Sequence, residues 1–231
     1  MAWLHSLTDY IHGLAWLQLM MDSFWSLLSA GLQFTLPLAI LSFIGGIILG
    51  FITALVRLYA PKPVKWIFDF YVWVIRGTPL LVQLFLIFYG LPSAGITLDA
   101  FPAALIGFTL SVGAYTSEII RGAIISVPKG QWEASYSIGM SSSQAMRRVI
   151  LPQSVFVSLP PLSNSFISLI KDTSLAAVIT VPEMFLAAQR IVSVTYEPLI
   201  LYVEAALIYL VFSTVLGKLQ NKLEVYYRRY E

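Results

Sequence analysis

The sequence predicts an all-α membrane protein with about five transmembrane helices, and three observations lead to this prediction. Of the 231 residues, 58% are hydrophobic and only 11% are charged, whereas soluble domains average about 25% charged residues. Several uncharged runs are long enough for the roughly 20 residues that a helix needs to cross a bilayer. Lysine and arginine gather in the segments between these runs.

The uncharged runs locate the expected spans. Residues 23–56 carry no charge and predict one long helix that is tilted or protrudes from the bilayer. Four further spans are expected at residues 77–98, 100–117, 149–170 and 198–217. The mixed segment 172–197 is expected to form a short helix or a re-entrant piece that packs on protein rather than on lipid.

The positions of the basic residues predict the orientation. Most of the 14 lysines and arginines lie between spans one and two, between spans three and four, or after span five. With five crossings all three groups fall on one side, and the positive-inside rule makes that side cytoplasmic. The N-terminus is therefore predicted outside and the C-terminus in the cytoplasm.

The segments at the two ends of the chain are expected to lie outside the bilayer core. Residues 1–22 predict an extracytoplasmic helix on the membrane surface, because apolar residues recur there at helical spacing: Trp3, Leu4, Leu7, Tyr10, Ile11 and Leu14. A transmembrane domain is expected over 23–223, with a cytoplasmic loop at 129–152, and a cytoplasmic tail follows at 224–231.

The composition excludes several kinds of site. The chain has no cysteine, so it has no disulfide, thiolate metal site or cysteine nucleophile. His5 and His12 are interpreted as polar positions of the surface helix, and no metal site is expected. The ATP-binding motif G-x-x-x-x-G-K-[ST] and the common hydrolase motifs are absent. The chain is therefore predicted to be non-catalytic.

A polar stretch, KGQWEASYSIGMSSSQAMRRVILPQ, interrupts the apolar runs on the predicted cytoplasmic side. Trp132, Ala134 and Ile138 predict a short amphipathic helix, and Gly139 allows a backbone bend at its end. Pro152 is expected to begin the fourth span, where its missing N–H is not needed. Six residues set the pattern of this loop: Glu133, Ala134, Ser135, Gly139, Leu151 and Pro152.

This pattern resembles the E-A-A-x-x-x-G-x9-I-x-L-P signature of the membrane subunits of bacterial ATP-binding cassette (ABC) importers, with Ser135 and Val149 as the two departures. Three other stretches, RGTPLLVQLFLIFYGLP, GAYTSEIIRGAI and NSFISLIKDTSLAAVITVPE, resemble the permeases of polar amino acid importers. The stretch PPLSNSFISLIKDTSLAA is similar to members that handle cystine and related sulfur amino acids.

The resemblance implies a type I ABC importer permease fold in the bacterial cytoplasmic (inner) membrane. The six loop residues would then couple the chain to a separate ATPase, with Glu133 pairing with a basic residue there. The implied partners are two copies of that ATPase, a second permease copy or sister permease, an extracytoplasmic substrate-binding protein and membrane lipid. No nucleic acid is implied. ATP and Mg would be bound by the ATPase, and no cofactor by this chain. An ordinary helix-loop that merely obeys the positive-inside rule is the alternative interpretation of the stretch.

Charged groups in the fourth span suggest a substrate pathway, since each costs roughly 2.5–3.5 kcal/mol near the bilayer centre. Four polar residues are predicted to share one helix face: Asn164, Ser168, Lys171 and Asp172. Pro160 and Pro161 are expected to kink or break this helix. Lys171 and Asp172 would contact the carboxylate and ammonium of an amino acid, or else form a structural ion pair or helix cap. Gln83 is a weaker pathway candidate.

Three further charged residues are assigned to gating or packing. Arg76 either faces the pore or anchors the cytoplasmic end of the second span, and the anchor is the preferred interpretation. Glu118 and Arg121 are predicted to pair, because residues three apart are neighbours on a helix.

The function predicted from these observations is the permease subunit of an ATP-driven importer of polar amino acids, with L-cystine as a candidate substrate. The alternative is a secondary amino acid transporter driven by an ion gradient. Such transporters usually contain internal structural repeats, and no duplication is visible in the sequence. An intramembrane enzyme is a third hypothesis, and no catalytic motif in the sequence supports it.

Overall fold

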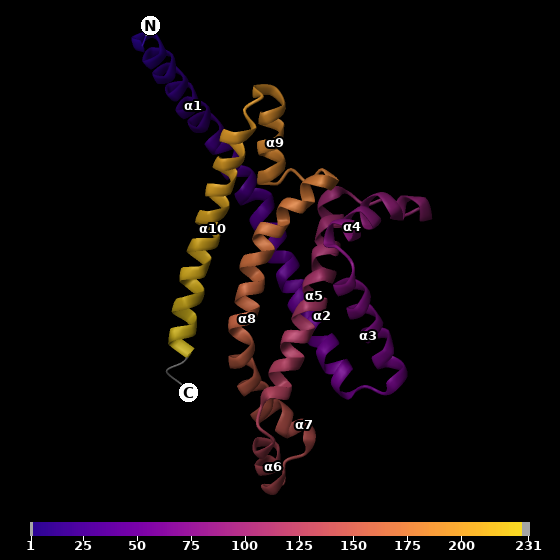
Figure 1. Cartoon of the computed structure of the whole chain (residues 1–231). Coiled ribbons are helices and arrows are strands. Elements are labelled where there is room, and N and C mark those ends of the chain that lie inside the picture. Colours follow the sequence, from indigo (N-terminus) through magenta and orange to yellow (C-terminus); the bar gives the residue numbers. More distant parts are fainter. Residues whose placement is uncertain (1, 228–231) are drawn as a thin grey trace.

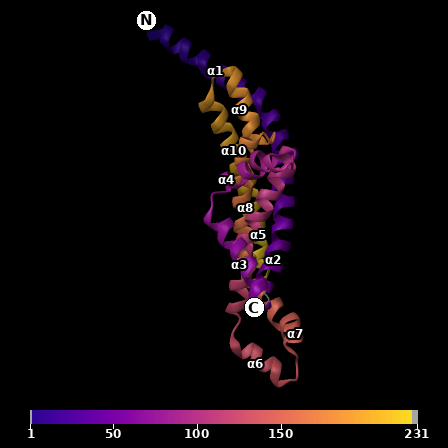
Figure 2. The same ribbon diagram turned by 90° about the vertical axis from the view of Figure 1, so that its right-hand side faces the viewer.

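The computed structural model describes the chain from Ala2 to Tyr227, with the side chains of residues 15–220 and 222. Over this range the elements are helices, joined into an elongated bundle (Figure 1). The bundle is narrower when turned by 90° (Figure 2). In chain order the elements are α1 (Ala2–Ala30), the π-helix η1 (Gly31–Thr35), α2 (Leu36–Tyr59), α3 (Lys62–Gly77), α4 (Leu80–Phe85), the π-helix η2 (Leu86–Gly90), the 3-10 helix η3 (Leu91–Ala94), α5 (Ala100–Ser126), α6 (Lys129–Ser137), α7 (Ser142–Ala145), the π-helix η4 (Met146–Ile150), α8 (Leu151–Asp172), the 3-10 helix η5 (Thr173–Ile179), α9 (Met184–Thr195) and α10 (Pro198–Tyr227).

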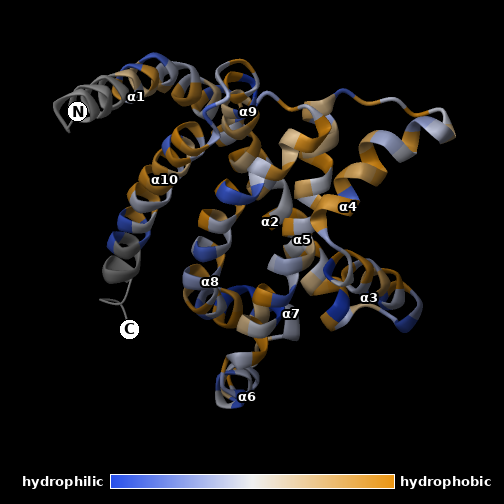
Figure 3. Cartoon of the chain, turned by 45° about the horizontal axis from the view of Figure 1, so that its top comes forward, coloured by the Kyte–Doolittle hydropathy of each residue, from blue (hydrophilic) through white to orange (hydrophobic). Residues whose placement is uncertain are grey.

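The helices provide up to five membrane spans in the described part of the chain, which agrees with the predicted number. Three stretches are long and apolar enough to cross alone: Ala15–Tyr59, Ala100–Ser126 and Pro198–Gln220. Two bent pairs supply the others, with a bend of 108° after α3 and of 51° before α9. Figure 3 shows hydrophobic residues along the upper part of α10 and hydrophilic ones recurring along α8. The orientation across the membrane stays a prediction.

The first span is one continuous helical stretch, as predicted for residues 23–56. It runs through α1, η1 and α2 and ends at Tyr59, because Ala60 precedes Pro61 and adopts an extended conformation with ψ 158°. Helix α1 passes residue 22 without a break, so the segment predicted to lie on the membrane surface continues directly into the span. The side chains on which that prediction depends, those of residues 1–14, lie outside the described residues. Tail residues 228–231 lie outside them too.

The second span differs from the predicted run at 77–98. Residues 62–77, expected in the connection, form the helix α3, and Thr78 and Pro79 then turn the chain into α4 with an extended backbone. Charged residues on α3 hide it from a search for uncharged runs. Its outer face is nevertheless strongly apolar, with four exposed large side chains: Trp66, Ile67, Phe70 and Trp73.

The fourth span begins earlier than predicted and is not broken by its prolines. Helical conformation starts at Ser142, where Ser141 and Gln144 form a capping box. The π-turn η4 widens the helix just before Pro152, so this proline lies inside a helical run rather than at its start. Pro160 and Pro161 lie inside α8, which continues to Asp172. The expected change of structure follows instead at η5 and α9, within the segment predicted to pack on protein.

Helices α2 and α5 approach each other closely along their length. Gly46 and Gly50 are buried on α2, and the hydroxyl of Thr116 on α5 donates to the carbonyl of Gly46 at 3.1 Å. Small residues permit such approach where lipid offers no hydrophobic drive between helices. A methyl group at Gly50 would overlap Thr116 and would lie 3.0 Å from backbone atoms of Gly113 and Ser117.

We therefore expect Gly50→Ala to destabilise the protein by about 1–3 kcal/mol, the usual range for overpacking. Alanine favours helix over glycine by up to about 1 kcal/mol, so a loss would report the clash and not propensity. Gly122→Ala on the neighbouring helix α5 is the control, since a methyl group there meets nothing within 4 Å. Thermal unfolding of the purified variants measures the difference. Equal midpoints for both would contradict the close approach.

Candidate functional site

A cavity of about 560 Å³ lies between α3, α5 and α8, bounded by Leu80 at the start of α4 and Leu175 in η5. The carboxylates of Glu118 and Asp172 and the guanidinium of Arg76 line it, together with neutral polar groups. The main polar side chains of its lining are Arg76, Tyr115, Glu118, Asn164, Ser168 and Asp172. Its size falls within the range of about 300–1,000 Å³ typical of small-molecule sites.

The cavity brings together three of the four residues predicted on one face of α8. Asn164, Ser168 and Asp172 line it, whereas Lys171 lines a separate hollow of about 500 Å³ between α8, α9 and α10, beside Tyr202. Adjacent residues point about 100° apart around a helix, so Lys171 and Asp172 do not share one wall. The prediction that these two residues face a ligand together is wrong in this geometry, and the structure shows no ion pair between them.

Gln83 does not line the cavity. Its amide nitrogen donates to the carbonyls of Ile75 at 2.8 Å and Thr78 at 3.1 Å, and to the Thr78 hydroxyl at 3.0 Å. These acceptors lie at the bend between α3 and α4, where helix-terminal carbonyls lack helical partners. Gln83 therefore closes the bend, and the structure gives it a place in the scaffold rather than in the cavity.

A cluster of charges adjoins the cavity around Glu118. The predicted pair is present: Arg121 donates to Glu118 Oε2 from Nη2 at 2.8 Å and from Nε at 3.1 Å. The same carboxylate accepts a hydrogen bond from Arg57 at 2.7 Å, and Arg57 also donates to Asp69 at 2.6 Å. Arg57 and Asp69 were not among the predicted site residues. A signal existed, since both flank the helix-breaking Ala60-Pro61 turn, which brings α2 and α3 side by side.

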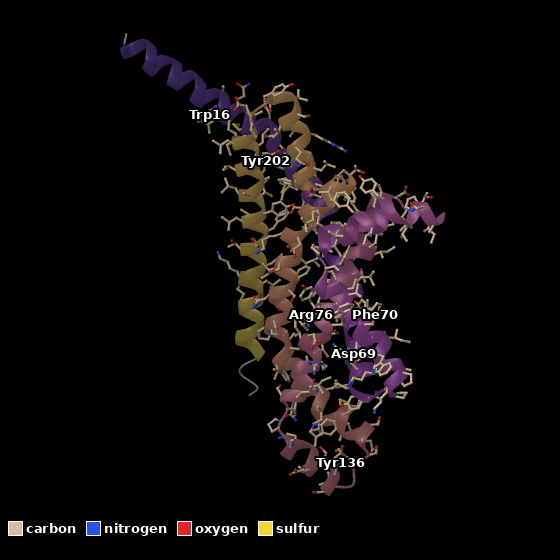
Figure 4. The ribbon with its side chains drawn as sticks, turned by 45° about the vertical axis from the view of Figure 1, so that its right-hand side comes forward. Trp16, Asp69, Phe70, Arg76, Tyr136 and Tyr202 are labelled. Carbon is tan, nitrogen blue, oxygen red and sulfur yellow. The ribbon has the colours of Figure 1, made fainter. Side chains whose placement is uncertain are left out.

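Arg76 faces the cavity, which overturns the preferred interpretation of it as an anchor. Its guanidinium lies 3.5 Å from Glu118 and sits over the ring of Tyr115, 5.4 Å from the centroid. Figure 4 places Arg76 about midway along the bundle, far from Tyr136 at the tip of α6. The residue thus occupies the interior of the candidate pathway.

Glu183 is a buried carboxylate that the sequence analysis did not single out. It has no exposed surface and caps α9 by accepting from the backbone N–H groups of Phe185 at 2.8 Å and Leu186 at 2.7 Å. Tyr209 on α10 donates to it at 2.8 Å. Glutamate is not among the residues that most favour the N-cap position, so the sequence carried little signal. Its role here is to join α9 to α10.

The polar loop forms a knob at the end of the bundle opposite α1 (Figure 1). The predicted short helix is α6, and the predicted bend lies at Gly139, with φ +83°. The N–H groups of Gly139 and Met140 donate to the carbonyls of Tyr136 at 2.9 Å and Ser135 at 3.1 Å, which is the Schellman pattern that a left-handed glycine permits. Glu133 and Ala134 are exposed on this helix.

Trp132 anchors the knob to the bundle. It packs against the apolar cluster formed by Ala54, Ile120, Ile124, Val127 and Ile150. Ser135 is buried too, and its hydroxyl donates to the carbonyl of Gln131 at 2.7 Å. Leu151 is partly buried against the same cluster, whereas Ile138 is 74% exposed. The knob is therefore held to the ends of α2, α5 and α8 while Ile138 and Glu133 face outward.

We expect Glu118→Gln to lower the free energy of unfolding by about 1–3 kcal/mol, because hydrogen bonds to charged groups are lost and three guanidinium groups remain with one carboxylate. Thermal unfolding of the purified protein measures the effect. Glu197→Gln is the control, since Glu197 is exposed at the other end of the bundle. An unchanged midpoint for Glu118→Gln would mean that the cluster contributes nothing to stability.

Comparison with protein families identifies the relatives of this chain. A family model described as "binding-protein-dependent transport system inner membrane component" matches residues 46–226. The L-cystine transport system permease protein TcyB of Bacillus subtilis (strain 168) is 55% identical over 213 residues, covering 92% of this chain and 91% of that protein. The glutamine transport system permease protein GlnP of Escherichia coli (strain K12) is 36% identical, covering 86% and 91%.

Solved structures agree with this result. A crystal structure of an amino acid ABC transporter with histidines has a chain that is 38% identical, with a TM-score of 0.84 over 89% of this chain and 95% of that one. A chain of the inward-facing MetNI methionine ABC transporter is 16% identical, with a TM-score of 0.66 over 90% and 95%. At that identity the second likeness concerns the fold alone.

Proposed function

Because the chain belongs to the family of binding-protein-dependent transport system inner membrane components, we propose that it imports polar amino acids, with L-cystine as the first candidate. As a member of this family it is the non-catalytic, membrane-embedded permease of an ABC importer in the inner membrane. An ion-gradient-driven secondary transporter, the alternative considered from the sequence, is therefore set aside. ATP hydrolysis belongs to a partner subunit.

The observation that carries this proposal is the placement of two features on one pair of helices. The middle of α5 and the C-terminal part of α8 line the polar cavity. The adjoining ends of the same helices hold the knob through the cluster at Ile124 and Ile150, against which Trp132 packs. A push on the knob would thus reach the cavity walls through stiff helices, which is what a transporter driven by a separate ATPase needs.

The substrate proposal draws on relatives and on the cavity. TcyB, at 55% identity, is an L-cystine transport system permease, while GlnP serves glutamine transport. Both substrates are zwitterionic amino acids with polar side chains. The cavity offers such a molecule polar groups on different helices: Asn164, Ser168 and Asp172 on α8, and Arg76 and Tyr115 on α3 and α5. L-cystine ranks first because TcyB shares more of its sequence with this chain.

The partner proposal follows the family. An ATPase and an extracytoplasmic substrate-binding protein work with such permeases, and we propose two ATPase copies, each docking on one knob, with ATP and Mg bound there. A second copy of this chain, or a sister permease, would complete the pathway. The knob residues Glu133, Ala134 and Gly139 would contact the ATPase, whereas Ser135, Leu151 and Pro152 would hold the knob in shape. The segment 1–22 would lie on the extracytoplasmic surface of the inner membrane, and residues 224–231 would lie in the cytoplasm.

Affinity purification of the tagged chain from its native membrane tests the coupling assignment. We expect a P-loop ATPase to be recovered with the wild type and at least about 10-fold less of it with Glu133→Lys, because truncating or reversing one member of a docked charge pair costs 2 kcal/mol or more. Gly139→Val should have a similar effect, since a β-branched residue does not tolerate φ +83°.

Two variants serve as controls in this purification. Gly130→Val adds the same side chain within α6, the helix that ends just before Gly139, at a glycine where a methyl group meets nothing within 4 Å and φ is not positive. Glu197→Lys makes the same charge reversal at the opposite end of the bundle. Recovery of the ATPase with all four variants alike would refute the role of the knob. Its absence from the wild type in several detergents would refute the ATP-driven class.

Uptake by proteoliposomes containing the purified transporter tests the substrate. With ATP inside and the binding protein outside, we expect uptake of labelled L-cystine that requires ATP and persists without an ion gradient. Asp172→Asn should reduce this uptake about 10-fold or more, as for loss of a charged hydrogen-bond partner, with little change in thermal stability. Lys171→Gln, one residue along and facing the other hollow, is the matched comparison and should have the smaller effect. Equal losses would argue against the cavity as the pathway.

A further inference from the structure

The charge cluster beside the cavity contains one more arginine than carboxylates. Three arginines, Arg57, Arg76 and Arg121, face two carboxylates, Asp69 and Glu118. Arg57 bridges both carboxylates, with distances of 2.6 and 2.7 Å. Arg121 occupies the second oxygen of Glu118 at 2.8 Å. These contacts satisfy Glu118 on both oxygens and leave Arg76 in excess.

Arg76 is the least engaged of the three arginines. Its distance to Glu118 is 3.5 Å, which is beyond the usual length of a charge-assisted hydrogen bond. Its side chain is 43% exposed, compared with 14% for Arg57 and 36% for Arg121. The Tyr115 ring supports the guanidinium from one side, in the manner of a cation–π contact. The group is thus held in place while most of its donors remain free toward the cavity.

The opposite wall of the cavity carries the complementary charge. Asp172 lies on α8 among the lining residues, and it has no ion pair with the described residues. Ser168 lies one helical turn before it on the same wall. One side of the cavity therefore carries Arg76 beside Glu118, whose charge is already paired with Arg57 and Arg121, and the side formed by α8 carries Asp172. Such a pair of walls suits a molecule that bears a carboxylate and an ammonium group, each of which would remain costly to bury without a partner.

We propose that Arg76 binds the α-carboxylate of the transported amino acid, with Asp172 contacting its α-ammonium group. On binding, Arg76 exchanges its 3.5 Å contact with Glu118 for paired N–H···O bonds to the substrate carboxylate, the geometry that guanidinium favours. Arg76 would thereby bind the substrate carboxylate, the role that the sequence pattern assigned to Lys171. Lys171 lines the other hollow. This inference rests on the proposed function, because it requires an amino acid as substrate.

The inference predicts which molecules the cavity rejects. A ligand with two ammonium groups but no carboxylate gives Arg76 nothing to bind and brings a like charge toward it. Cystamine, which is cystine without its two carboxylates, is such a ligand. Arg76 would then select for the carboxylate common to all amino acids, while the remaining lining accommodates the side chain.

Equilibrium binding to the permease–ATPase complex, without the external binding protein, tests this selection. The probes are labelled L-cystine and labelled cystamine, and the wild type should prefer cystine. Arg76→Gln should weaken cystine binding about 10- to 100-fold, as for the loss of a charge-assisted hydrogen-bonded pair, and leave cystamine binding unchanged or tighter. Arg76→Lys should fall between them, because lysine keeps the charge but not the planar fork.

Arg190→Gln is the control, since it removes the same charge at an exposed position of α9 that neither lines the cavity nor belongs to the charge cluster. Its ratio of cystine to cystamine affinity should equal that of the wild type. Equal ratios in Arg76→Gln and the wild type would overturn the inference and reduce Arg76 to a structural role, as would a wild type that takes up cystine but binds none in the cavity. In both cases ATP-dependent uptake would leave the proposed function standing, whereas a wild type that takes up no amino acid would refute the function itself.

Discussion

Where Gly46 and Gly50 of α2 face α5, α2 contributes no side chain, so Val112 and Thr116 of α5 pack directly against its backbone, and the other features of the molecule depend on this contact. Between apolar helices lipid supplies no hydrophobic drive, so close packing and hydrogen bonds must hold them together. The bond from Thr116 to the Gly46 carbonyl, at 3.1 Å, is one of these. With α5 fixed in this way, its middle forms a wall of the cavity and its end holds α6.

The charged cluster depends on the fixed position of α5, because Glu118 lies on that helix. Glu118 projects from α5 toward α2 and α3, and Arg57 links it to Asp69 across the α2–α3 turn. The cluster therefore ties the bent second span to the first and third spans. It also leaves Arg76 turned toward the cavity over Tyr115. One group of ionic contacts thus both stabilises the bundle and sets the charge of the candidate substrate site.

Sequence patterns predicted local features well and failed where several helices meet. The short helix and the bend at Gly139 were predicted correctly, because they depend on a few neighbouring residues. Helix α3 was missed because its charged residues look like a surface connection in the sequence, although Asp69 and Arg76 pair with residues on other helices. Lys171 was grouped with Asp172 by spacing alone. Spacing defines an arc of the helix surface, and only the neighbouring helices decide which part of that arc faces a cavity.

The sequence by itself determined the membrane location, the approximate number of spans, the family and the position of the knob. Each of these follows from composition, uncharged length or a contiguous motif, which need no knowledge of distant contacts. Only the tertiary structure decided that Trp132 points inward, that Gln83 closes a bend, and that Arg76 shares a cavity with Asp172. These outcomes depend on pairs of residues far apart in the chain. Their side chains meet because helix packing brings them together, and no local pattern encodes that meeting.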